Sequence, residues 1–120
     1  MARFLEQALR HSFEGPYVMF DVIAKMKFQP DEIGKKWQLE TIIIEKDRIT
    51  PDDVFRDHNW SRTFIANQET VSLEIHVPIQ KSDMNTEPGK EEVYAKLKVV
   101  PLEGDFPVGE AITNMVEIDV

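Results

Sequence analysis

Apolar and polar side chains alternate along much of this chain. The clearest alternation covers residues 17–28, 71–79, 93–99 and 112–120. A period of two places one set of side chains on a core and the other set in water, which is typical of half-buried β-strands. Two further segments, 37–45 and 62–66, show the same character less strongly. The pattern therefore predicts about six to eight strands.

Two segments break the alternation and predict short helices. The apolar residues from Phe4 to Leu9 share a helical stripe, so we expect an amphipathic N-terminal helix over residues 2–12. Farther along, Thr50 suits the N-cap position and Pro51 suits the first helical position. One or two helical turns are expected there, over residues 51–56.

Turn residues separate the expected strands. Segments 30–34, 86–89 and 103–107 each combine proline and glycine with acidic residues. The chain shows no long crossover of the βαβ kind. These features predict a mainly β fold, an antiparallel β-sandwich, with a helix laid on a single sheet as the alternative. The length of 120 residues suits a single domain that spans residues 1–120.

Composition narrows the classes of partner. The net charge is −8 and there is no cysteine, which excludes disulfides and cysteine-based zinc or iron–sulfur sites. Because phosphate backbones repel an acidic chain, we expect no nucleic-acid partner. Glu6 and Arg10 interrupt the apolar run that a signal peptide needs, and no apolar run reaches the roughly 18 residues of a membrane span. A soluble, cytoplasmic protein without a membrane partner is expected.

The common catalytic and cofactor motifs are missing. None of the five glycines belongs to a G-x-G or a P-loop motif, so both frequent phosphate cradles are lacking. No serine lies in G-x-S-x-G, and H-E-x-x-H does not occur. A triad can still be assembled from distant residues, because triads are defined by geometry. The sequence favours a non-enzymatic protein without an organic cofactor.

Acidic residues cluster within residues 47–60. Asp52, Asp53 and Asp57 are the candidate metal ligands, since clustered carboxylates can supply the oxygens that calcium needs. Their spacing does not match an EF-hand. The alternative is that Asp52 and Asp53 complement the dipole of the expected helix while the others face solvent. Asp57 and His58 could also act as acid and base, although adjacent residues usually point apart.

Four lysines could form a basic patch on this acidic chain. Lys25 and Lys27 lie on the polar side of one expected strand, and Lys96 and Lys98 lie on that of another. If the two strands are neighbours, the four ammonium groups would attract an anionic headgroup or an acidic partner. The alternative is a solvated face on which the lysines protect exposed strands from aggregation.

The last expected strand is a candidate interface. Its alternating residues are Ile112, Asn114, Val116, Ile118 and Val120. A terminal strand that is β-rich and weakly charged is a poor free edge. It is expected either to pair with a second copy, forming a dimer, or to lie within its own sheet.

The two tryptophans, Trp37 and Trp60, are expected in the core or at its edge, because large aromatic side chains mostly serve burial.

Alternating strands joined by turns resemble the architecture of transthyretin-like and C2-like sandwiches. A shared architecture does not determine function. We expect a non-enzymatic interaction or self-assembly module whose partner is itself, as a homo-oligomer, or another protein. The alternative is a ligand- or calcium-binding sandwich that uses residues 47–60. A small enzyme that uses Asp57 and His58 is a third hypothesis.

Overall fold

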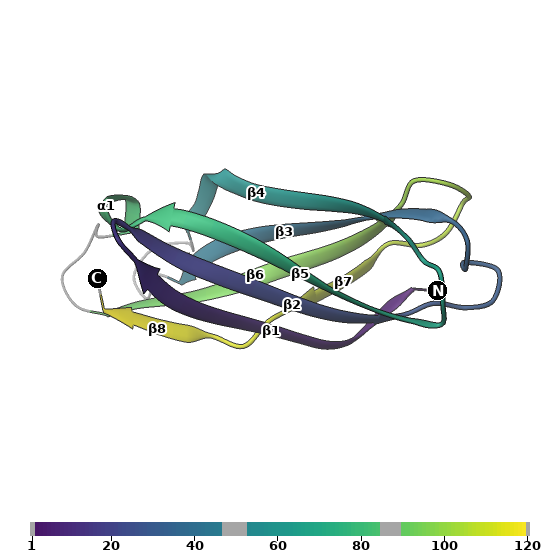
Figure 1. Cartoon of the computed structure of the whole chain (residues 1–120), viewed down its shortest axis with the longest axis horizontal. Coiled ribbons are helices and arrows are strands. Elements are labelled where there is room, and N and C mark those ends of the chain that lie inside the picture. Colours follow the sequence, from purple (N-terminus) through teal and green to yellow (C-terminus); the bar gives the residue numbers. More distant parts are fainter. Residues whose placement is uncertain (1, 47–52, 85–89, 120) are drawn as a thin grey trace.

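The described part of the chain, residues 2–46, 53–84 and 90–119 of the computed structural model, forms eight strands in two antiparallel sheets (Figure 1). Residues 53–58 are described by their backbone alone. The strands are β1 (Arg3–Glu14), β2 (Tyr17–Lys27), β3 (Lys36–Lys46), β4 (Asp53–Ile65), β5 (Thr70–Gln80), β6 (Lys90–Pro101), β7 (Gly109–Ile112) and β8 (Val116–Asp119). One sheet has the order β1-β2-β5, and the other has the order β4-β3-β6-β7, with β8 also paired to β6. The predicted mainly β antiparallel sandwich is confirmed.

The core lies between the two sheets and follows the predicted alternation. In β2, the inward residues Val18, Phe20, Val22, Ala24 and Met26 are fully buried. The inward positions of β3, β5 and β6 meet them and form one continuous cluster. Each large apolar side chain buried in this way contributes about 1.5–3 kcal/mol. The central strands therefore carry most of the stability of the fold.

An aromatic group closes one end of the core. Trp37 stacks on Phe106 with ring centres 5.6 Å apart, and Phe28 lies 5.1 Å from Trp37 on another side. The Trp37 indole N–H donates to the backbone oxygen of Glu32 at 3.3 Å, so its polar edge is satisfied although the residue is buried. The loop that carries Phe106 turns at Gly104, which has a φ of +79°. The prediction that Trp37 is a core aromatic is confirmed.

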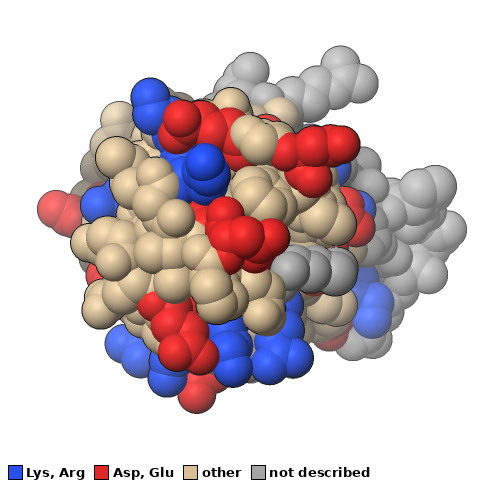
Figure 2. All heavy atoms as spheres, turned by 90° about the vertical axis from the view of Figure 1, so that its right-hand side faces the viewer, with Lys and Arg blue, Asp and Glu red and all other residues tan. Residues whose placement is uncertain are grey.

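The surface over this end carries charges of both signs (Figure 2). In that view, Lys and Arg side chains are interspersed with Asp and Glu side chains around an uncharged area. The face seen there therefore presents no large field of a single sign that would steer a charged partner.

The N-terminal helix predicted over residues 2–12 is wrong, because these residues form most of β1. Gly15, with a φ of +55°, and Pro16 make a two-residue turn that folds β1 back along β2. A register irregularity between Phe4 and Glu6 shifts the side-chain phase. Because of that shift, the apolar residues of this strand do not follow a strict period of two. Their spacing therefore resembles the stripe of an amphipathic helix.

The helix predicted over residues 51–56 is also wrong for the residues that the structure describes. Residues 53–56 belong to β4, where Val54 pairs with Ile44 and Asp53 pairs with Glu45; residues 51 and 52 lie outside the described residues. One or two isolated helical turns are marginal in water. A long β3–β4 ladder satisfies more backbone groups and therefore prevails. A short helix that the sequence did not predict, α1 (Lys81–Met84), follows β5.

The strand predicted over residues 112–120 is divided into β7 and β8. Thr113 between them turns inward and is buried, while Ile112 points outward and is 60% exposed. The Thr113 N–H donates to the Ala95 carbonyl, and the Ala95 N–H donates to Thr113 Oγ1, each at 2.9 Å. The break shifts the inward phase by one residue, so that Ile118 is buried behind it. The apparent alternation concealed this shift.

Asn114 fastens the two sheets together along one long side. Its Oδ1 accepts from the Leu9 N–H at 2.9 Å, and its Nδ2 donates to the Leu9 carbonyl at 3.1 Å. Nearby, Gln7 Nε2 donates to the Ile112 carbonyl at 3.1 Å. The edge of β1 is thus held against the segment from β7 to β8. Among the described residues, no helix is long and apolar enough to cross a membrane.

Candidate functional site

The acidic cluster falls largely outside what the structure describes. Asp47 and Asp52 lie outside the described residues, and Asp53, Asp57 and His58 belong to the part of β4 described by its backbone alone. The described side chains contain no group of three or more histidines and carboxylates placed to hold a metal ion. The calcium hypothesis therefore stays a prediction from the sequence.

The four lysines lie on opposite sides of the molecule. Lys25 and Lys27 point outward from β2 in the three-stranded sheet, and Lys96 and Lys98 point outward from β6 in the other sheet. Because the outer faces of a sandwich point away from each other, the structure does not bring the four ammonium groups together. Lys98 Nζ lies 3.5 Å from Glu110 Oε1 on its own face. Lys27 Nζ likewise lies 3.4 Å from Glu69 Oε1, so two of the four lysines have a carboxylate beside them.

The predicted terminal interface has neighbours within the chain on both sides. β8 pairs with β6 along one edge, and β1 lies against the other. Ile118 is buried in the core, Val116 is half-buried and Asn114 is bonded to β1. Ile112 and Asn114 are the exposed ones among the described members, and Val120 lies outside the described residues. This segment is therefore already engaged inside its own fold.

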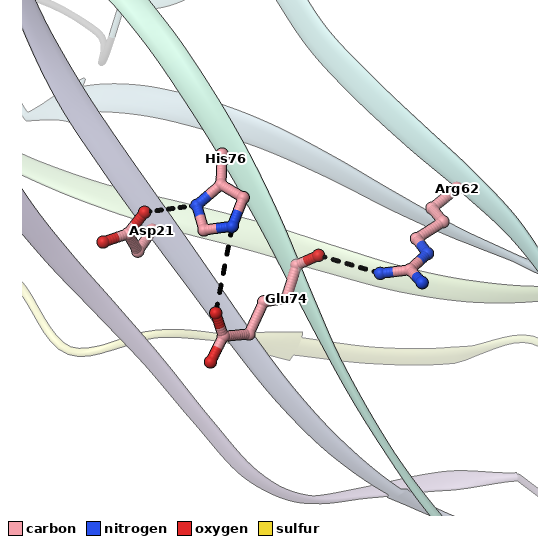
Figure 3. A network of polar contacts seen from close by, with 4 residues as sticks. All are labelled: Asp21, Arg62, Glu74 and His76. Atoms are coloured by element: carbon pink, nitrogen blue, oxygen red, sulfur yellow. Dashed lines mark hydrogen bonds and ion pairs between the residues drawn. The ribbon is translucent and has the colours of Figure 1, made fainter.

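A histidine between two carboxylates lies on the outer face of the three-stranded sheet (Figure 3). His76 Nδ1 is 2.5 Å from Asp21 Oδ1, and His76 Nε2 is 3.9 Å from Glu74 Oε2. The two carboxylates face different ring nitrogens, so the three groups do not converge on one point where a metal could sit (Figure 3).

The residues beside this histidine pair on β2 and β5 supply no nucleophile. Triads place a nucleophile within hydrogen-bond reach of the histidine. Along β2 and β5, the described residues that flank the pair on its face are Met19 and Ile23, and Pro78 and Glu74. None of these four carries a hydroxyl or a thiol. With His76 61% exposed, the pair is a solvated surface contact of the kind that adds little stability.

Three of the four sheet edges in the described structure are protected. β1 is covered by the Asn114 contacts, and the segment from β7 to β8 is covered by β1 in return. β5 contains Pro78, which has no N–H to offer, and its Glu74 carbonyl accepts from Arg62 Nη1 at 3.2 Å (Figure 3). Proline and side-chain contacts of this kind block the addition of another strand.

The fourth edge, that of β4, is different. Among the described strands β4 pairs only with β3, and it runs along one long border of the sandwich (Figure 1). Residues 59–63 are all exposed, on both faces of the strand. β4 contacts β5 of the facing sheet, where Arg62 Nη1 donates to the Glu74 carbonyl. We call the exposed residues 59–63 the overhang of β4. Among the described strands, none pairs with the backbone edge of β4 that faces away from β3.

Pairing with β3 shows which side chains of the overhang point toward the sandwich interior. Trp60 pairs with Thr41, Arg62 with Leu39, and Phe64 with Trp37. These three β3 residues point inward, so the β4 residues that pair with them point inward as well. Phe64 reaches the core, where its ring centre lies 5.9 Å from that of Phe28. Trp60, however, is 37% exposed. The expectation that it lies in the core or at its edge is wrong, because Trp60 belongs neither to the core cluster nor to the residues packed against it.

An open groove borders the outer face of the overhang. It has a volume of about 250 Å³ and lies between β3 and β4. Its lining residues are Gln38, Glu40, Thr41, Ile42, Asn59, Trp60 and Ser61. A strand added beside β4 would extend the sheet next to this groove.

The sequence contains a signal for this edge that the period-two interpretation did not use. Residues 59–65 carry aromatic, β-branched and small polar side chains, a single charge at Arg62, and no proline. Long edge strands of this composition, without lysine or proline to block them, are ready to pair with another chain. The segment was predicted only as a weak strand over 62–66.

The chain matches no protein-family model, no curated protein and no solved structure with which it was compared. The surface of the fold is therefore the basis on which a function can be assigned.

Proposed function

We propose that this protein is a non-enzymatic interaction module that binds a partner protein by adding a strand to the free edge of β4. In strand addition, backbone hydrogen bonds supply affinity and alternate side chains supply specificity. The observation that carries the proposal is the overhang of β4, where residues 59–63 are exposed on both faces. The proposal moves the interface from residues 112–120 to β4, because β8, within the former segment, lies between β6 and β1.

The contrast between edges supports this choice. The edges of β1 and β5 are blocked by side-chain hydrogen bonds or by proline. Natural proteins use such devices on sheet edges that must not pair with another chain. β4 carries neither device over residues 59–65. The other sheet edges of this fold are closed, so the open edge of β4 supports a role in binding a partner strand.

Site-specific photo-crosslinking tests the proposal whatever the identity of the partner. A photoreactive amino acid is placed at Ser61 on β4, and in a control at Ser12, which is exposed on the covered strand β1. We expect an intermolecular crosslink from position 61 and none from position 12.

Charged side chains on the edge provide the second arm. Replacing Asn59 and Thr63 together by lysine, or together by glutamate, should remove the crosslink from position 61, because charges on an edge strand oppose strand addition. If both the lysine and the glutamate double variants lose the crosslink, the charges have blocked the edge. If only one of the two loses it, the cause is charge repulsion with the partner. Equal crosslinking from positions 12 and 61, or a crosslink that both double variants leave intact, would overturn the proposal.

A further inference from the structure

We propose that the strand added to β4 is β4 of a second copy of the chain, antiparallel and centred on Ser61. This inference rests on the proposed function and names its partner. Two antiparallel copies of one strand are related by a two-fold axis, which is the commonest symmetry of homo-oligomers. The axis would join the two wider sheets into one continuous sheet across the dimer.

The pleat restricts the possible registers. A two-fold axis normal to the sheet keeps inward side chains inward in both copies. Residues that face each other across the axis must therefore both be inward or both be outward, since side chains alternate along a strand. The axis must therefore lie midway between the two copies of one residue, so that this residue pairs with itself. It cannot lie at the level of the peptide bond between two consecutive residues. Within the overhang, the centres to compare are Trp60, Ser61 and Arg62.

Charge and ladder length favour the centre at Ser61. A centre at Arg62 sets the two Arg62 side chains opposite each other, and like charges in that position are unfavourable. Regular pairing of β4 with β3 covers residues 59–65, so a centre at Trp60 leaves only residues 59–61 as symmetric regular strand. A centre at Ser61 uses residues 59–63 and places no two like charges opposite each other.

The same register pairs Trp60 of each copy with Arg62 of the other. Both side chains are inward-facing, and both belong to the exposed overhang. An arginine guanidinium stacks well on an indole ring, and its edge can still donate hydrogen bonds. Arg62 already donates one such bond to the Glu74 carbonyl (Figure 3). The two cation–π pairs would lie beside β5, next to the hydrogen bond from Arg62 to Glu74.

Single cysteines report this register directly, because the chain has no cysteine of its own. Directly opposed residues in antiparallel strands have Cα atoms about 4.5–5.5 Å apart, within the range that a disulfide spans. Under oxidation, Ser61→Cys should form a disulfide-linked dimer. Asn59→Cys alone and Thr63→Cys alone should not, because each residue lies about 13 Å along the strand from its own copy. A mixture of these two variants should crosslink.

A charge exchange at the proposed pair provides an independent test in solution. Trp60→Lys sets a lysine against Arg62, and Arg62→Glu removes the cation from Trp60. Each single variant should weaken self-association by about tenfold or more, as judged from sedimentation equilibrium, because the pair occurs twice in the dimer. The double variant sets lysine against glutamate and should restore association. A centre at Trp60 or at Arg62 instead sets like charges together, so the double variant would remain dissociated.

The outcomes separate this inference from the proposed function. If the purified protein is monomeric and Ser61→Cys does not crosslink, while position 61 photo-crosslinks to a different chain, self-pairing is wrong and strand addition remains. If Asn59→Cys or Thr63→Cys crosslinks with itself, or if the double variant stays dissociated, the register is wrong. If position 61 contacts no other chain, both proposals are wrong. Circular dichroism of each variant confirms that it is folded.

Discussion

Replacing Asn114 by alanine should loosen the side on which the two sheets are fastened together. Asn114 bonds both the N–H and the carbonyl of Leu9, at 2.9 and 3.1 Å. No other side chain in the described structure makes a pair of hydrogen bonds between β1 and the segment that follows β7. Alanine cannot replace either bond, and Leu9 itself is only 2% exposed.

The expected loss follows from those two bonds. A protein hydrogen bond contributes about 0.5–1.5 kcal/mol net, so two contribute about 1–3 kcal/mol to the free energy of unfolding. A domain of this size loses roughly 4 °C of Tm per kcal/mol, which gives a fall of roughly 4–12 °C. Asn114→Asp keeps an acceptor for the Leu9 N–H but sets a carboxylate against the Leu9 carbonyl. It should therefore also be destabilised.

Urea denaturation and thermal melting followed by circular dichroism measure both quantities. Asn67→Ala is the matched control, because Asn67 is an exposed loop residue and surface substitutions of this kind usually stay within about 0.5 kcal/mol. If Asn114→Ala melts together with Asn67→Ala, the two hydrogen bonds do not hold the sheets together, and the description of a fastened and an open side is wrong.

Three further substitutions test packing inside the fold by the same denaturation assays. Thr113→Val leaves the buried Ala95 N–H without its 2.9 Å acceptor and should cost about 1–2 kcal/mol; an unchanged midpoint would show that the hydroxyl is dispensable. Thr41→Val should instead stabilise by about 1 kcal/mol, because Thr41 Oγ1 is buried without a hydrogen-bond partner in the described structure; a loss would reveal a partner. Gly104→Ala should cost about 1–3 kcal/mol, since φ is +79° and a Cβ would lie 2.5 Å from the Phe106 ring; a neutral result would mean that the loop adapts freely.

The central strands of this fold could be predicted from the sequence because burial on one face imposes a strict period. β2 and β6 lie in the middle of their sheets, and their inward residues are almost all apolar. Edge strands are covered less completely, so their composition is less constrained. β1 shows the consequence, since the irregularity near Phe4 and its exposed residues made it resemble a helix.

The positions that organise the surface could not be predicted from local pattern. Asn114 bonds Leu9 across 105 residues of sequence, and nothing near either residue indicates the contact. The division between β7 and β8 depends on the Thr113 hydroxyl meeting Ala95, which is also a tertiary event. The free edge of β4 follows from its place at the border of its sheet. Strand order, which alternation does not encode, decides which edge remains free.

Hydrogen exchange at low and at high protein concentration tests the central claim most directly. If two copies pair through β4, backbone amides within residues 59–65 should become protected as concentration rises, while those of β1 and of residues 109–119 stay unchanged. Protection that instead appears within residues 109–119 would place the interface on the terminal strands. Exchange in β4 that does not depend on concentration would contradict pairing between copies.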